Sequence, residues 1–123
     1  MSTYKSFSEA EVQSLLDEGE VPASIRGAAD KVAVIFTQDW CIDWVVMDRF
    51  LPEFAGQVEI YVLVYNQHPR FQEIMTFKEE TFGNFEIPYL RYFWKGQLIT
   101  ETNKLPRNTF AALLTKEKPF SLK

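Results

Sequence analysis

Two apolar, strand-like segments separated by an amphipathic stretch most strongly constrain how this chain folds. Residues 32–36 form an unbroken apolar run rich in β-branched side chains, the pattern of a strand covered on both faces of a sheet. Residues 58–65 predict a second strand. Between them, apolar residues recur at steps of three and four, which predicts a helix from about Cys41 to Ala55 that Pro52 kinks or shortens. This order favours a right-handed crossover between the strands.

The flanking segments complete an α/β pattern. A capping box of Ser8 and Glu11 opens an N-terminal helix over about residues 8–18, and residues 19–30 are expected to form a connection. The remaining expected elements are a helix over residues 69–80, an antiparallel pair of strands over residues 89–94 and 97–101, and a C-terminal helix that begins at Pro106. Together they predict a mixed sheet of four or five strands with helices on both faces, in a single domain over residues 1–123.

Composition narrows the class of protein. With one cysteine among 123 residues, the chain can close no internal disulfide and build no cysteine-rich zinc site, so it must fold by packing alone. Its 17 acidic and 13 basic residues give a net charge of −4, which argues against nucleic acid or an anionic membrane as a main partner. The sequence shows no signal peptide and no membrane-spanning run, so we expect a soluble, cytoplasmic protein.

The single cysteine, Cys41, follows a predicted buried strand and opens the amphipathic helix. Backbone N–H groups and the helix dipole at such a position stabilise an anion, and thus a reactive thiolate. Asp39 and Asp43 oppose this effect because they place negative charge within two residues of the thiol. Free cysteine is also among the most buried residue types, so the residues alone leave a reactive thiol and an inert core thiol as alternatives.

Two motifs resemble the thioredoxin family. The segment Val32–Trp44, with the sequence VAVIFTQDWCIDW, resembles the strand, loop and active-site helix in which a Trp-Cys pair opens a Cys-x-x-Cys motif. The segment Glu86–Leu98, with the sequence EIPYLRYFWKGQL, resembles the cis-proline loop and the hairpin that follows it. The resemblance covers about residues 28–116 and implies a thioredoxin fold.

Pro88 lies at the start of a predicted strand. On its own it allows either an ordinary strand start or a cis peptide bond with Ile87. The resemblance implies the cis bond, with Ile87 and Pro88 beside Cys41 in space. The sequence also contains four large aromatic rings near these motifs, those of Trp40, Trp44, Tyr89 and Tyr92. We expect them either to form an aromatic rim around Cys41 or to pack in the core.

The chain also departs from the thioredoxin pattern. Trp44 replaces the second cysteine of the motif, so a mixed disulfide at the first would have no internal partner to resolve it. Ile35 and Val62 stand where the family carries a buried Asp and its Lys partner, and an ion pair replaced by two apolar residues can be neutral or stabilising. Asn103 lies near a glycine position of the family, and the segment over residues 69–88 is longer than usual.

The resemblance supports two hypotheses for the function. In the first, Cys41 is the catalytic residue of a monothiol, weak or glutathione-dependent thiol–disulfide oxidoreductase that serves cell redox homeostasis. Its partners would be protein or peptide thiols and disulfides, or glutathione. In the second, the chain is a redox-inactive, chaperone-like module that binds peptides or proteins in a groove around Trp44 and Pro88. The expected substrate-binding residues are Trp40, Ile42, Asp43, Trp44, Ile87 and Pro88.

No cofactor and no metal is expected, and the chain is expected to be a monomer or a weak dimer. A glutathione-bridged iron–sulfur carrier is disfavoured, because Cys-Ile-Asp-Trp stands where monothiol glutaredoxins carry Cys-Gly-Phe-Ser. The bulky Trp44 would crowd a cluster.

Overall fold

A mixed sheet of four strands forms the centre of the molecule. The computed structural model describes residues 4–115, and its strands are β1 (Lys31–Thr37), β2 (Glu59–Val64), β3 (Tyr89–Trp94) and β4 (Gln97–Thr102). Their order across the sheet is β2-β1-β3-β4. Strands β1 and β2 are parallel, and β3 is antiparallel to both β1 and β4. The apolar run in β1 is therefore paired on both edges, as its sequence predicts.

The N-terminal segment does not form a fifth strand within residues 4–115. It adds one parallel bridge to the edge of β2, where the Lys5 N–H donates to the Ile60 carbonyl and the Val62 N–H donates to the Lys5 carbonyl, both at 2.9 Å. Of the two predicted forms of the sheet, the four-stranded one is correct for the part of the chain that the structure describes.

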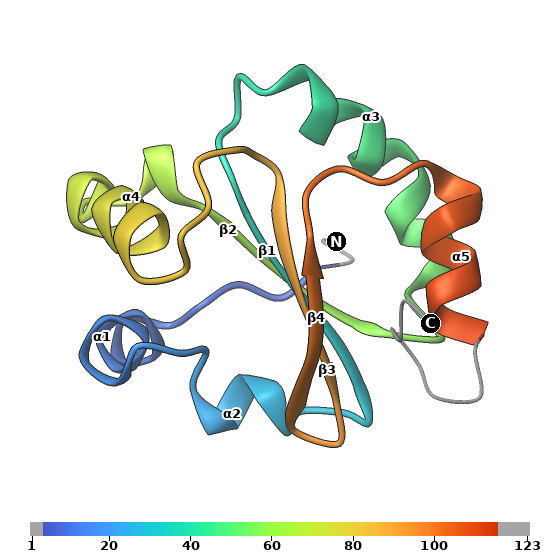
Figure 1. Cartoon of the computed structure of the whole chain (residues 1–123), viewed down its shortest axis with the longest axis horizontal. Coiled ribbons are helices and arrows are strands. Elements are labelled where there is room, and N and C mark those ends of the chain that lie inside the picture. The colour runs from blue at the N-terminus through green and yellow to red at the C-terminus, as the bar shows by residue number, and fades with distance from the viewer. Residues whose placement is uncertain (1–3, 116–123) are drawn as a thin grey trace.

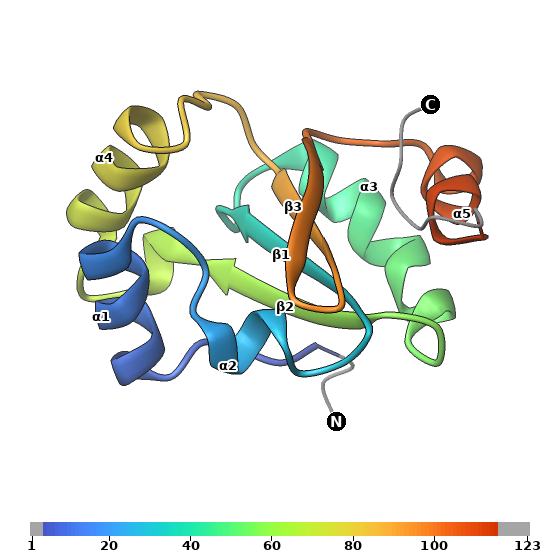
Figure 2. The same cartoon turned by 60° about the horizontal axis from the view of Figure 1, so that its bottom comes forward.

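Helices cover both faces of the sheet (Figures 1 and 2). On one face lie α1 (Glu9–Glu18), α2 (Ala23–Arg26) and α4 (Phe71–Glu80), and on the other lie α3 (Ile42–Phe50), the 3-10 helix η1 (Leu51–Phe54) and α5 (Arg107–Thr115). A second 3-10 helix, η2 (Tyr65–Gln67), leads from β2 to α4. Strand β1 supplies both cores, because Val34 and Phe36 pack with the first set of helices and Ala33 and Ile35 with the second.

The helix predicted over residues 41–55 is divided in the structure. It ends at Phe50, and η1 continues the path of the chain. Pro52 explains the division, because proline lacks the backbone N–H that a continuing α-helix would use to bond to the Asp48 carbonyl.

Other boundaries follow the sequence closely, with two differences. The N-terminal helix begins at Glu9 with Ser8 as its cap, as predicted. The helix predicted from residue 69 begins two residues later, and the connection over residues 19–30 contains the single turn α2, which is too short to show a periodic pattern. Residue 116, the end of the predicted core, lies outside the described residues.

Strand register fixes which loops meet. Phe36, near the end of β1, pairs with Tyr89, the first residue of β3. The loop that follows β1 and the segment that precedes β3 therefore leave the sheet at the same end, which is also where α3 begins (Figure 1).

Candidate functional site

The Cys41 thiol lies where these two connections meet. Cys41 is the N-cap residue of α3, in extended backbone conformation, and is 5% exposed. Its Sγ lies 3.6 Å from the Ile87 carbonyl oxygen, to which it donates a hydrogen bond. The Ile87–Pro88 peptide bond is cis, and Pro88 is buried. The structure thus brings Cys41 to Ile87 and its neighbour Pro88, although Cys41 and Ile87 are 46 positions apart in the sequence.

The two carboxylates that flank Cys41 are bound to other segments. Hydrogen bonds from the Asn66 and Gln67 side chains lower the pKa of Asp39, so this carboxylate is ionised at neutral pH. Asp43 pairs with Lys104, whose Nζ lies 3.2 Å from its Oδ1. Lys104 thus offsets the charge of Asp43, whereas the neutral amides of Asn66 and Gln67 hold Asp39 in its ionised form.

Large apolar side chains are exposed on both sides of Cys41 in the chain and two residues before Ile87. Trp40 is 65% exposed, and Ile42 and Phe85 are each 74% exposed. The Trp40 indole N–H donates to Gln38 Oε1 at 2.6 Å, which fixes the ring on the loop. We call Trp40, Ile42 and Phe85 the apolar rim. Trp40 and Ile42 were expected in the site, whereas the sequence reasoning missed Phe85 because nothing in its local pattern shows that it is left uncovered.

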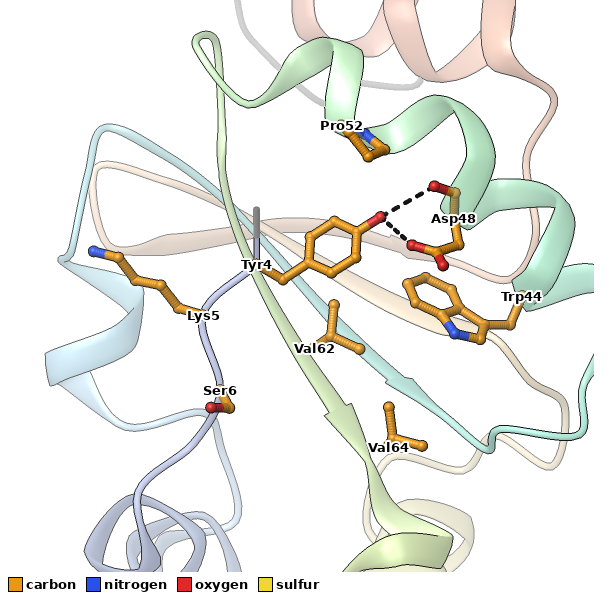
Figure 3. Close-up of a pocket in the computed structure, with 8 residues that line it drawn as sticks. All are labelled: Tyr4, Lys5, Ser6, Trp44, Asp48, Pro52, Val62 and Val64. Carbon is orange, nitrogen blue, oxygen red and sulfur yellow. Dashed lines mark hydrogen bonds between the residues drawn. The ribbon is translucent and has the colours of Figure 1, made fainter. Parts of the chain in front are cut away.

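Trp44 lines a pocket at the edge of the sheet (Figure 3). It is 7% exposed and packs against Tyr4, with ring centroids 5.9 Å apart. The pocket has a volume of about 550 Å³, and residues 84–88 do not line it. Its lining comes from the N-terminal segment, α3, η1 and β2, namely Tyr4, Lys5, Ser6, Trp44, Asp48, Pro52, Val62 and Val64.

The interrupted helix helps to build this pocket. Because Pro52 has no N–H, the Asp48 carbonyl is left without its helical donor and accepts instead from the Tyr4 hydroxyl at 3.4 Å. The same hydroxyl donates to Asp48 Oδ1 at 2.5 Å. Burial, followed by the contact with Asp48, raises the pKa of Tyr4, so its hydroxyl stays protonated and donating. A groove shared by Trp44 and Pro88, as the binding-module hypothesis requires, is therefore not formed by this pocket.

Comparison with solved structures gives extensive matches. Thioredoxin O2 from Arabidopsis thaliana superposes with a TM-score of 0.64 at 18% sequence identity, over 92% of each chain. A thioredoxin variant from Halobacterium salinarum gives a TM-score of 0.63 at 15% identity, over 93% of this chain and 91% of that one. The chain has the thioredoxin fold. The sequence itself matches no protein-family model and no curated protein.

Within this thioredoxin fold, the predicted pairing of Ile35 with Val62 is confirmed. The two residues are direct partners in the parallel β1–β2 register, and they are 0% and 8% exposed. Ile35 and Val62 both lie in the core cluster that contains Cys41 and Trp44. The site behind the thiol is thus apolar, with no carboxylate or ammonium at either position.

The remaining aromatic candidates divide between surface and core. Tyr89 and Tyr92 are fully buried, so they belong to the core and not to a rim around Cys41.

Among residues 4–115, no group of three or more His, Cys, Asp or Glu side chains is arranged to hold a metal ion. No helix in the described range is long and apolar enough to cross a membrane.

Two side chains near the thioredoxin-fold site carry contacts that the sequence reasoning did not assign. Asn84 and Asn103 hydrogen-bond to each other and to the backbone around Ile87. The sequence singled out Asn103 only as a departure from a glycine. The sequence does place an asparagine in each of the two connections that flank the hairpin. Because an asparagine amide readily hydrogen-bonds to loop backbone, these two residues could have been predicted to make such contacts.

Proposed function

We propose that this protein catalyses monothiol thiol–disulfide exchange through Cys41, with protein or peptide disulfides as substrates. The observation that carries the proposal is the position of the thiol, at the N-terminus of α3 and beside the segment of Ile87 and Pro88. Backbone N–H groups in the first turn of α3 favour the thiolate when the thiol loses its proton. The thioredoxin fold supports this chemistry by analogy.

In the proposed reaction, the Cys41 thiolate attacks one sulfur of the substrate disulfide. A mixed disulfide forms, and the other substrate sulfur leaves as a thiolate and takes up a proton. A small external thiol, such as glutathione, then attacks Cys41 Sγ and releases the second substrate thiol. A second small thiol attacks the sulfur of the first and frees Cys41. One substrate disulfide is reduced, and two small thiols are oxidised to a disulfide.

An external thiol is needed because Trp44 occupies the position of a resolving cysteine. Trp44 is 7% exposed and lies in the same core cluster as Cys41. The substrate contacts we propose are the apolar rim together with Asp43, Ile87 and Pro88. A reducing compartment such as the cytoplasm would keep Cys41 free and supply the small thiol.

Insulin reduction with glutathione, glutathione reductase and NADPH tests the proposal. We expect turnover in the wild-type protein, none in Cys41→Ser, and a mixed disulfide of Cys41 with one glutathione by mass spectrometry. Turnover that survives in Cys41→Ser, or a wild-type protein that neither turns over nor forms the mixed disulfide, would contradict it.

A rim variant separates substrate binding from thiol chemistry in the same assay. Trp40→Ala should raise KM for insulin while leaving the formation of the glutathione mixed disulfide unchanged, because Trp40 is 65% exposed and lies outside the core. An unchanged KM would remove Trp40 from the proposed substrate contacts.

A further inference from the structure

A single side-chain amide holds the backbone on both sides of Ile87. Asn103 directly follows β4, and its Nδ2 lies 3.2 Å from the Glu86 carbonyl oxygen and 3.1 Å from the Pro88 carbonyl oxygen. The same nitrogen lies 3.0 Å from Asn84 Oδ1. The carbonyls immediately before and after Ile87 are thus both fixed to one point on the end of the sheet.

Asn84 completes this attachment. Its Nδ2 donates back to Asn103 Oδ1 at 3.0 Å, and its Oδ1 accepts the Glu86 N–H at 3.0 Å. The Asn84 carbonyl accepts from the buried Lys78 ammonium at 2.8 Å, which ties the segment to α4 as well. We call the reciprocal pair Asn84 and Asn103 the amide clamp.

The clamp determines where the Ile87 carbonyl points. Since the neighbouring carbonyls of Glu86 and Pro88 are both held by Asn103, the Ile87 peptide group between them cannot turn without breaking a clamp bond. Its oxygen remains 3.6 Å from Cys41 Sγ. We propose that Asn103 is a positioning residue that holds the Ile87 carbonyl on the Cys41 thiol and thereby restrains the reactivity of this thiol.

The restraint has a direct chemical cause. The thiolate is the nucleophile in alkylation and in disulfide exchange. A hydrogen bond from the neutral thiol to a carbonyl favours the neutral form, and the partial negative charge of the carbonyl oxygen disfavours the thiolate. A clamp that fixes this oxygen keeps the thiol engaged as a donor, whereas a loosened segment leaves the sulfur free to be approached. The inference concerns regulation of the proposed exchange reaction and rests on that function for its biological meaning.

Two isosteric variants isolate the clamp. Asn103→Asp removes every hydrogen bond that Nδ2 donates, whereas Asn84→Asp keeps the acceptor contacts of Oδ1 and loses only one donated bond. Each variant adds one negative charge, and at position 84 this charge also meets Lys78, whose Nζ lies 3.4 Å from Asn84 Oδ1. We expect iodoacetamide at pH 7 to alkylate Asn103→Asp about fivefold faster than Asn84→Asp, the factor for one net hydrogen bond. Equal rates in the two variants would overturn the inference.

A spectroscopic measurement on the wild-type protein does not depend on the folding of any variant. Cys41 is the single cysteine, so the infrared S–H stretching band arises from it alone. We expect this band at lower wavenumber in the native protein than in urea, because the native thiol donates to Ile87. Coincident bands would overturn the inference.

These readouts separate the inference from the proposed function. Neither alkylation nor the S–H band requires disulfide exchange. If the alkylation rates and the S–H band are as expected but insulin is not reduced, the clamp inference stands and the proposed function is wrong. If insulin is reduced but the two variants are alkylated at equal rates, the proposed function stands and the clamp inference is wrong.

Discussion

At the scale of single residues, burial of a charged group distinguishes this chain most clearly. Lys78 on α4 is 1% exposed, donates to the Asn84 carbonyl, and has its Nζ 5.6 Å from the centroid of the Tyr89 ring. Burial lowers the pKa of Lys78 to about 8, although the nearby charges of Glu79 and Glu86 act in the opposite direction. An ammonium group is therefore held against the amide clamp at neutral pH.

This lowered pKa predicts a pH-dependent stability. Between pH 8 and 10.5 the unfolded chain keeps Lys78 protonated while the folded chain loses the proton. The unfolded state then binds more protons, so the free energy of unfolding rises with pH across this window and is independent of Lys78 titration below it. In urea titrations from pH 7 to 10.5, the difference between wild type and Lys78→Met should grow in favour of wild type.

An exposed lysine provides the control for this experiment. Lys104→Met removes the same charge from a side chain that is 65% exposed, and it is measured over the same pH range. A flat difference for Lys78→Met would show that Lys78 titrates in the folded protein as it does in the unfolded chain.

At the scale of elements, short local signals set the ends of the helices. Helix α1 begins after Ser8, whose side chain accepts from the Glu11 N–H at 3.1 Å while Glu11 accepts from the Ser8 N–H at 2.9 Å. The helix ends at Gly19, which takes a φ of 78° and closes the last turn. Because these contacts span only three or four residues, the sequence pattern predicts them directly.

The capping box makes a measurable contribution to stability. Ser8→Ala should lower the free energy of unfolding by about 1 kcal/mol, because one N-terminal N–H of α1 loses its acceptor. Ser6→Ala, two positions earlier and outside the helix, is the matched control and should change stability far less. Urea unfolding followed by far-ultraviolet circular dichroism measures the free energy of unfolding of both variants. Equal losses in Ser8→Ala and Ser6→Ala would show that the Ser8 cap does not stabilise α1.

At the scale of the whole molecule, an ion pair joins the connection after α1 to the middle of the sheet. Arg91 on β3 is 6% exposed, and its guanidinium pairs with Glu20 and lies 4.0 Å from the centroid of the Phe82 ring. Its Nη1 also donates to the Tyr89 hydroxyl at 2.7 Å. Glu20 and Arg91 are 71 residues apart, so this contact depends on the complete fold.

Removal of the Glu20 charge should destabilise the whole molecule. Glu20→Gln leaves the buried Arg91 cation with weaker partners, and we expect a loss of about 2 kcal/mol in the free energy of unfolding. Glu18→Gln removes the same charge from an exposed position at the end of α1 and should leave stability nearly unchanged. The ion pair would be structurally unimportant if the two variants had the same urea midpoint.

The same scale separates what could be predicted at the candidate site from what could not. The position of Cys41 between a buried strand and a helix follows from local periodicity, whereas the pairing of Ile35 with Val62 was expected from the resemblance to the thioredoxin family. Trp44 was expected in a groove with Pro88, and the structure adds a contact with Tyr4, a residue 40 positions earlier. The Trp44–Tyr4 contact requires the N-terminal segment to lie along the edge of β2, and no local sequence pattern predicts this placement.

The sequence by itself determined the strands, most helix ends and the thiol at the start of α3. Each of these depends on residues within one or two turns, or on the alternation of a strand, and such patterns are written locally. Only the tertiary structure decided that Trp44 faces a separate pocket and that the Asn84–Asn103 pair fixes the carbonyl opposite Cys41. Those contacts join residues 15 to 46 positions apart, and their geometry exists only once the sheet and its loops are assembled.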